Sequence, residues 1–295
     1  MAGLLRGALR WYSGVEHAEV STDSLSLIGD RLPYCLVLGE HACGKTSLLF
    51  LAAILAAAEE GKRVLFISRS PIQTLPAPLV GLRARLGPLS LKVGIFSLGL
   101  HGKQTLTQSD FPGNKMPKIQ FLYPRSSDEL LQVVASVHEN EKLVPSLIIV
   151  DGLNEYAATS GHHFVAHVSA LLVDTAAFLT ERFSAISKNP EGVNSKCSVI
   201  VSLTLPSCTD DETEGSLNVI ERYFPVRCWL EKDTYSPEGV VEGQNFRVYF
   251  SEESGIEPQQ DSASGSQETK EWKVMFRESG EMTVLPLRPS NSGTM

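Results

Sequence analysis

Short apolar runs recur along this chain, and longer apolar or amphipathic segments separate them. Mostly apolar runs of four to six residues bounded by polar positions are typical of strands that are buried on both faces of a parallel sheet. Such runs lie at residues 34–38, 64–67, 119–123, 147–150 and 198–203. The longer segments predict helices at residues 46–60, 126–139, 164–183 and 217–223.

The last part of the chain has a different pattern, because its predicted strands follow one another without a helix between them. They lie at residues 227–231, 245–250, 272–276 and 282–285, and the last two alternate about Ser279 and Gly280, which predicts a closing hairpin. This order predicts an α/β fold: a mostly parallel sheet with helices on both faces and antiparallel C-terminal strands.

Length and composition fit one sizeable domain, since the chain has 295 residues, 42% hydrophobic and 20% charged. Residues 1–12 contain Arg6 and Arg10 and no acid, a composition also found in mitochondrial presequences. The early Glu16 and Glu19 favour a plain N-terminal helix or arm. We predict an N-terminal arm at 1–30, a domain at 31–286 with a basic insertion at 77–117 and a disordered acidic loop at 251–271, and a flexible tail at 287–295.

The formal net charge of −8 is unevenly distributed along the chain. Residues 81–125 hold seven Lys/Arg against one acid, whereas residues 209–214 hold four acids and no base. The basic segment is either a contact for a phosphate backbone or a solvated loop, and both interpretations stay open. The five cysteines are scattered, which favours a reducing compartment, and no apolar run reaches the roughly 18 residues that a membrane span needs.

A phosphate-binding motif joins the first predicted strand to the first predicted helix. Two glycines separated by four residues and followed by Lys and Thr form the Walker A, or P-loop, pattern, and its residues are Gly39, Glu40, His41, Ala42, Cys43, Gly44, Lys45 and Thr46. The glycines let backbone N–H groups converge on phosphates, and the helix N-terminus adds positive charge. We expect Lys45 to contact the β- and γ-phosphates, Thr46 to bind Mg²⁺, and the Cys43 side chain to point away from the phosphates.

A carboxylate ends the strand at residues 147–150, about a hundred residues after the P-loop. Asp151 at that position is expected to hold the Mg²⁺ shell, and its alternative role is to cap the next turn. Hydrolysis also needs a group that orients or deprotonates water. Glu155 lies four residues further on and is one candidate, and Glu40 inside the P-loop is a second.

Three histidines, His162, His163 and His167, form a second cluster of potential ligands. His163 and His167 are four residues apart and so share a helix face, which is a spacing found in metal sites. No further ligand type lies close by in the sequence, so a solvated helix face is the favoured interpretation.

The order of these parts is similar to the core of the RecA/Rad51 recombinases, which are P-loop ATPases. Segments such as 121–124, 151–156, 221–225, 228–230 and 272–277 resemble the Rad51-paralogue-like ATPases that partner SWIM-type zinc-finger proteins in Shu-type complexes. The resemblance covers roughly residues 33–77, 118–231 and 271–286.

The resemblance implies a RecA-like core that uses ATP and Mg²⁺, with the P-loop residues on the nucleotide and Asp151 on the metal. It also implies a nuclear protein that binds single-stranded DNA, has DNA-stimulated ATPase activity, and supports Rad51 filaments. Its implied partners are a SWIM-type zinc-finger protein, Rad51 and the Rad51 paralogues, in a hetero-oligomer away from membranes.

Departures from the recombinase pattern limit what the resemblance implies. Recombinases carry a catalytic Glu just after the second core strand, where this chain has residues 68–71, Ser-Arg-Ser-Pro. They carry a Gln after a later strand, where this chain has Leu203, Thr204 and Leu205, and the DNA loop that follows is replaced by an acidic stretch at 206–215. These differences predict slow hydrolysis, and DNA contact through the basic segment or through a partner.

Three hypotheses for function follow from these features. The first is a recombination accessory ATPase, and the second is a scaffold that binds ATP to stabilise a partner complex and scarcely hydrolyses it. The third is a small-molecule P-loop kinase, which would need an Arg-rich lid; Arg83 and Arg85 are the candidate pair. The helix after Asp151 and the all-strand ending argue against a kinase.

Overall fold

The computed structural model describes residues 2–14, 33–58, 62–71, 97–98, 119–139, 144–157, 161–186, 196–206, 211–233, 243–252, 271–277 and 281–287. Within these residues the chain forms one ten-stranded sheet in the order β10-β9-β8-β7-β1-β6-β5-β2-β4-β3. The seven parallel strands are β1 (Tyr34–Gly39), β2 (Val64–Ser68), β3 (Ser97–Leu98), β4 (Ile119–Leu122), β5 (Leu147–Asp151), β6 (Ser198–Thr204) and β7 (Val226–Lys232).

The remaining strands form the antiparallel edge that the sequence predicts. They are β8 (Gln244–Glu252), β9 (Glu271–Phe276) and β10 (Met282–Leu287), and each pairs antiparallel with the strand before it. The predicted α/β class, the mostly parallel sheet and the closing hairpin are therefore confirmed.

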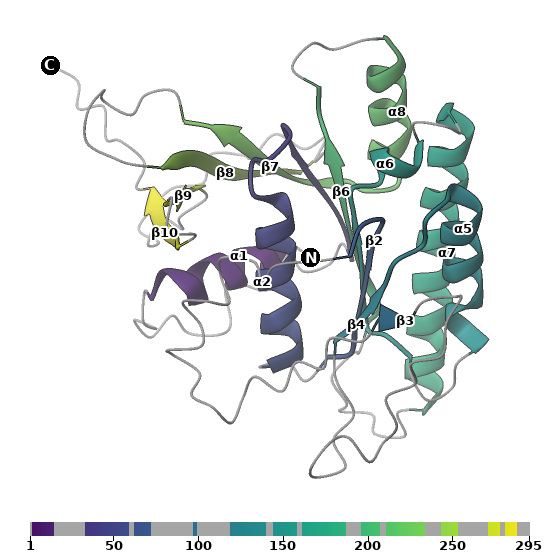
Figure 1. The fold of residues 1–295 in the computed structure, drawn as a ribbon. Coiled ribbons are helices and arrows are strands. Elements are labelled where there is room, and N and C mark those ends of the chain that lie inside the picture. Colours follow the sequence, from purple (N-terminus) through teal and green to yellow (C-terminus); the bar gives the residue numbers. More distant parts are fainter. Residues whose placement is uncertain are drawn as a thin grey trace, which may run out of the picture.

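Helices cover both faces of the parallel sheet, as Figure 1 shows. One layer contains α1 (Ala2–Ser13) and α2 (Lys45–Ala58), and the other contains α5 (Ser127–Ser136), α6 (Asn154–Ala157), α7 (Gly161–Ile186) and α8 (Asp211–Glu221). Two buried apolar clusters correspond to these layers, because side chains from alternate positions of each strand enter opposite clusters. On β1, for example, Val37 belongs to the cluster under α2, whereas Leu36 and Leu38 belong to the cluster under α7.

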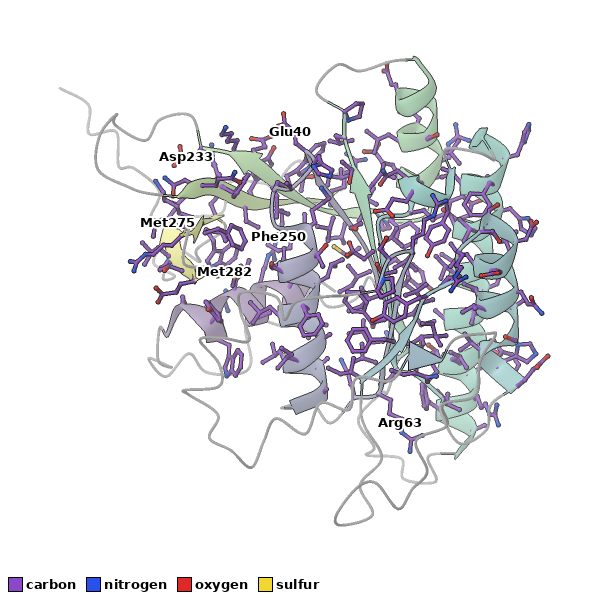
Figure 2. All side chains as sticks on the ribbon, viewed as in Figure 1. Glu40, Arg63, Asp233, Phe250, Met275 and Met282 are labelled. Atoms are coloured by element: carbon purple, nitrogen blue, oxygen red, sulfur yellow. The ribbon has the colours of Figure 1, made fainter. Side chains whose placement is uncertain are left out.

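The N-terminal helix α1 is part of the core. Leu5, Ala8 and Leu9 are fully buried, and the Tyr12 hydroxyl donates to the carbonyl of Met282 in β10 at 3.0 Å. The Arg6 guanidinium lies 4.8 Å from the centre of the Phe250 ring in β8. In Figure 2, Phe250 and Met282 lie on the antiparallel part of the sheet close to this layer. The chain's first described helix therefore holds its last strands against α2.

Two predicted elements differ from the observed ones in their extent. The helix expected at 217–223 begins six residues earlier, at Asp211, and ends at Glu221. The long helix α7 extends from Gly161 to Ile186. By length and composition, its residues His163–Ala185 would suffice to cross a membrane. Its apolar side chains instead pack on the sheet, as in the core helix of a globular domain.

Candidate functional site

The P-loop follows β1 and turns directly into α2. Ala42 and Gly44 have positive φ angles, 58° and 91°, which produce the reversal between strand and helix. A Cβ atom on Gly44 would lie 2.4 Å from the ring of Phe276, so the backbone and this ring from β9 require a glycine there. A Cβ atom on Gly39 would lie 2.6 Å from Cys43 Sγ and 2.7 Å from the carbonyl oxygen of Leu230 in the neighbouring β7. Both motif glycines are therefore needed for close packing.

The P-loop lies at the carboxyl end of the parallel strands, where ligands bind in open α/β sheets. In Figure 2, Glu40 lies at the upper end of the sheet, whereas Arg63, which precedes β2, lies at the lower end. The side chains of Glu40 and His41 are exposed, whereas Cys43 is buried in the core beneath the loop. Burial raises the pKa of the Cys43 thiol, and the neighbouring Lys45 amine opposes that rise.

The Lys45 amine forms hydrogen bonds with backbone carbonyl groups of its own loop. Its Nζ atom donates to the carbonyl oxygens of Gly39 at 2.9 Å and Glu40 at 2.5 Å, and lies 3.5 Å from Cys43 Sγ. The side chain is 7% exposed, so a buried positive charge is stabilised by loop carbonyl groups. Phosphate oxygens are stronger acceptors for an ammonium than these neutral carbonyls, so an incoming phosphate can replace them.

Thr46 and Asp151 meet at the mouth of this loop, although 105 residues separate them in sequence. The Thr46 hydroxyl donates to Asp151 Oδ2 at 2.7 Å, which places the start of α2 over the end of β5. The Asp151 residue is largely buried, with 9% of its surface exposed. A hydroxyl and a carboxylate oxygen at neighbouring positions are hard oxygen ligands of the type that Mg²⁺ prefers, so these two residues fit the metal.

Ser202 of β6 fixes the Asp151 carboxylate, and the sequence analysis did not identify it. Its hydroxyl donates to Asp151 Oδ1 at 2.6 Å and accepts the backbone N–H of Gly152 at 2.8 Å, and the residue is fully buried. A polar residue inside an otherwise apolar strand was the signal that could have identified it. The two oxygens of Asp151 are thereby divided between β6 and α2.

The segment after Asp151 is tied to the end of β6. The backbone N–H of Leu153 donates to the Ser202 carbonyl at 3.0 Å, and the N–H of Thr204 donates to Asn154 Oδ1 at 2.9 Å. The Tyr156 hydroxyl donates to the carbonyl of Pro124 at 3.0 Å, which anchors α6 to the chain after β4. The short helix that carries Glu155 and follows β5 is thus held by contacts to the ends of β6 and β4.

The Glu155 carboxyl is close enough to Asp151 for the two charges to interact. Burial raises the pKa of its carboxyl, and the charge of Asp151 raises it further, whereas Arg69 and His41 lower it. Its side chain folds back over Gly152, because a Cβ atom on that glycine would lie 2.8 Å from Glu155 Oε1. Arg69, which follows β2, donates Nη1 to the backbone carbonyl of Glu155.

The remaining candidates from the sequence contribute no further ligand set in the described part of the chain. No group of three His, Cys, Asp or Glu residues there is placed to hold a metal ion, and His163 and His167 are exposed on α7. Of the seven basic residues at 81–125, Arg125 is described; it precedes α5, whose N-terminus is capped by the Ser126 hydroxyl accepting the backbone N–H of Glu129. The other six basic residues and the His162 side chain lie outside what the structure describes.

Comparison with known proteins identifies similar chains. No protein-family model matches this sequence. The Mus musculus protein named ATPase SWSAP1 is 34% identical over 259 residues, which are 86% of this chain and 73% of that protein. The Homo sapiens protein of the same name is 32% identical over 262 residues, which are 88% of this chain and 92% of that protein. These matches extend well beyond the P-loop.

Proposed function

Because the chain belongs to the family of the ATPase SWSAP1 proteins, we propose that it binds ATP with Mg²⁺ and hydrolyses the nucleotide slowly. The observation that carries this proposal is the 2.7 Å contact between Thr46 and Asp151 at the mouth of a glycine-framed loop. That contact joins the two halves of a nucleotide site, the phosphate-binding half on β1 and α2 and the metal-binding half on β5.

Each residue of the site has a separate role in this proposal. The backbone N–H groups of the P-loop surround the phosphates, and Lys45 exchanges its loop carbonyls for β- and γ-phosphate oxygens. Thr46 and Asp151 would hold Mg²⁺, which neutralises phosphate charge when bound. Ser202 orients Asp151, and Glu155 is the candidate for positioning the attacking water.

The residues at the end of β2 are the reason to expect slow turnover. In the part of the chain that the structure describes, Ser68, Arg69, Ser70 and Pro71 follow or end that strand, and no carboxylate is among them. Glu155 reaches the site from the end of β5 instead, with its backbone carbonyl bound by Arg69. A carboxylate with a raised pKa is a better base than an ordinary one when it is ionised, but it is ionised less readily.

The proposal extends to a complex in the nucleus. The family resemblance supports a SWIM-type zinc-finger protein as partner, with binding to single-stranded DNA and support of Rad51 and its paralogues in homologous recombination. The positive charge of residues 81–125 supports DNA contact through this segment. Arg125, its last residue, follows β4 and so lies at the carboxyl end of the parallel strands, as the P-loop does. The four acids at 209–214 in the sequence make that stretch unsuitable for contact with a phosphate backbone.

The second candidate is an ATP-binding scaffold with negligible hydrolysis. The observation that favours it is the arginine in place of an acid after β2. The experiment is to purify the chain with a SWIM-type zinc-finger protein and measure phosphate release with and without single-stranded DNA. Stimulation by DNA supports the ATPase, whereas nucleotide binding without release supports the scaffold.

The Lys45→Ala variant separates the two candidates in the same preparation. An accessory ATPase with this substitution loses turnover while the complex stays intact. A scaffold loses the complex itself, because the bound nucleotide would stabilise the partner interface.

A further inference from the structure

Arg69 lies next to the metal-binding end of the site. It follows Ser68, the last residue of β2, and Ser68 is paired in register with Asp151 on the adjacent strand β5. Adjacent strands are about 4.8 Å apart, so the backbone of Arg69 begins one strand away from Asp151. The contact between Thr46 and Asp151 places the N-terminus of α2 above this point. Arg69 therefore lies beyond Asp151, on the side away from the P-loop strand.

The guanidinium of Arg69 is oriented by a contact that does not neutralise its charge. Nη1 donates to the Glu155 backbone carbonyl, which is an uncharged acceptor, and the residue is exposed. A guanidinium has five N–H donors in a fixed planar arrangement, so donors remain for a second ligand. Other arginines on this sheet, such as Arg247 with Glu271 and Arg277 with Glu281, are instead paired with carboxylates.

The charge of Arg69 acts on this site. It lowers the pKa of Glu155 against the opposing effects of burial and of Asp151. Two carboxylates close together oppose the binding of a further anion, and each added phosphate group of a nucleotide increases that repulsion. A cation at this position offsets that repulsion most for the phosphate nearest to the ends of β5 and β2. In the proposed orientation of the nucleotide this is the terminal phosphate.

We propose that Arg69 binds the terminal phosphate of the nucleotide and is the residue by which this chain prefers a nucleoside triphosphate to a diphosphate. The planar fork of an arginine matches two phosphate oxygens at once. The inference rests on the proposed function, because it requires a nucleotide in the P-loop with its phosphates directed toward Asp151.

The test is a calorimetric titration of the full chain with ADP and with a non-hydrolysable ATP analogue, both in Mg²⁺. In Arg69→Ala the affinity for the triphosphate falls about tenfold or more, the effect typical of a lost charged hydrogen bond, whereas the affinity for ADP stays within about twofold. In Arg69→Lys the loss is smaller, since the charge remains and the fork is absent. Arg182→Ala is the matched control, because Arg182 is also described with Nη1 donating to a backbone carbonyl, that of His138.

Three results would overturn the inference. Equal losses for ADP and triphosphate in Arg69→Ala would mean that Arg69 acts only by supporting α6, and unchanged affinities for both would mean that it contacts no phosphate. If the unaltered chain bound neither nucleotide, the proposed function would fail together with the inference. Normal binding by the unaltered chain with no selective loss would overturn the inference alone.

Discussion

Ser202→Ala tests whether the Asp151 carboxylate is fixed by the buried hydroxyl of β6. The substitution removes one oxygen atom and leaves the strand otherwise intact. It deletes the 2.6 Å bond to Asp151 Oδ1 and leaves the Gly152 N–H without the acceptor that now lies at 2.8 Å. Both losses occur at a fully buried side chain, so water cannot readily replace the hydroxyl.

The magnitude follows from the type of each bond. A hydrogen bond to a charged group contributes about 1.5–3 kcal/mol, and a buried donor left without an acceptor costs about 1–3 kcal/mol. Because the two bonds share one atom, their effects overlap, and we expect the free energy of unfolding to fall by about 2–4 kcal/mol. Mg²⁺-dependent nucleotide affinity should fall as well, since a freed carboxylate can rotate away from the metal position.

Ser169→Ala is the matched control, because Ser169 is equally buried and its hydroxyl has no hydrogen-bond partner among the described residues. Removing an unpaired buried hydroxyl from a helix should leave stability unchanged or raise it by about 0.5–1.5 kcal/mol. The assay is urea unfolding of the unaltered chain and both variants, followed by circular dichroism. Equal stabilities for the two variants would refute the assigned role of Ser202.

Three further predictions test other parts of the structure. Glu155→Gln should raise thermal stability increasingly as the pH rises above 4.5 through the raised pKa of Glu155, because burial, and then the charge of Asp151, disfavour the ionised carboxyl. The substitution should have no effect below that window, and a pH-independent difference in melting temperature would contradict this. Gly44→Ala should lower the free energy of unfolding by more than the roughly 1–2 kcal/mol that a positive φ costs a residue with a side chain, because the added Cβ would overlap the Phe276 ring. Combining it with Phe276→Ala should recover part of this loss, and a coupling energy near zero in the double-mutant cycle would argue against the contact. Leu5→Ala should lower the free energy of unfolding by about 2–5 kcal/mol, measured in urea, if α1 belongs to the core, whereas an unpacked arm would tolerate it.

Local sequence patterns were sufficient to predict the parallel part of the fold. Each buried strand is a nearly continuous apolar run, and the P-loop fixes the connection between β1 and α2 through its own residues. The hairpin of β9 and β10 was also predictable, because Ser279 and Gly280 lie in the sequence between two segments that alternate in hydrophobicity. In each of these cases the signal and the structure occupy the same short stretch.

The rest depends on contacts between distant segments, which no local pattern contains. The spacing in α1 is compatible with a helix, but the Tyr12 contact to Met282 lies 270 positions away in the chain. Ser202 meets Asp151 only because β5 and β6 are paired in a particular register, which a single sequence does not reveal. The position of Arg69 beside the site likewise follows from the register between β2 and β5.

The central claim is that one site built from the P-loop and Asp151 binds ATP with Mg²⁺. The most direct measurement is a titration of the purified chain with ATP in Mg²⁺ and in excess EDTA, compared with Lys45→Ala and with Lys62→Ala, whose lysine precedes β2 at the opposite end of the sheet. We predict binding that weakens in EDTA, that is lost in Lys45→Ala and that persists in Lys62→Ala. Binding that ignored Mg²⁺ and survived Lys45→Ala, or no binding by the unaltered chain, would contradict the account.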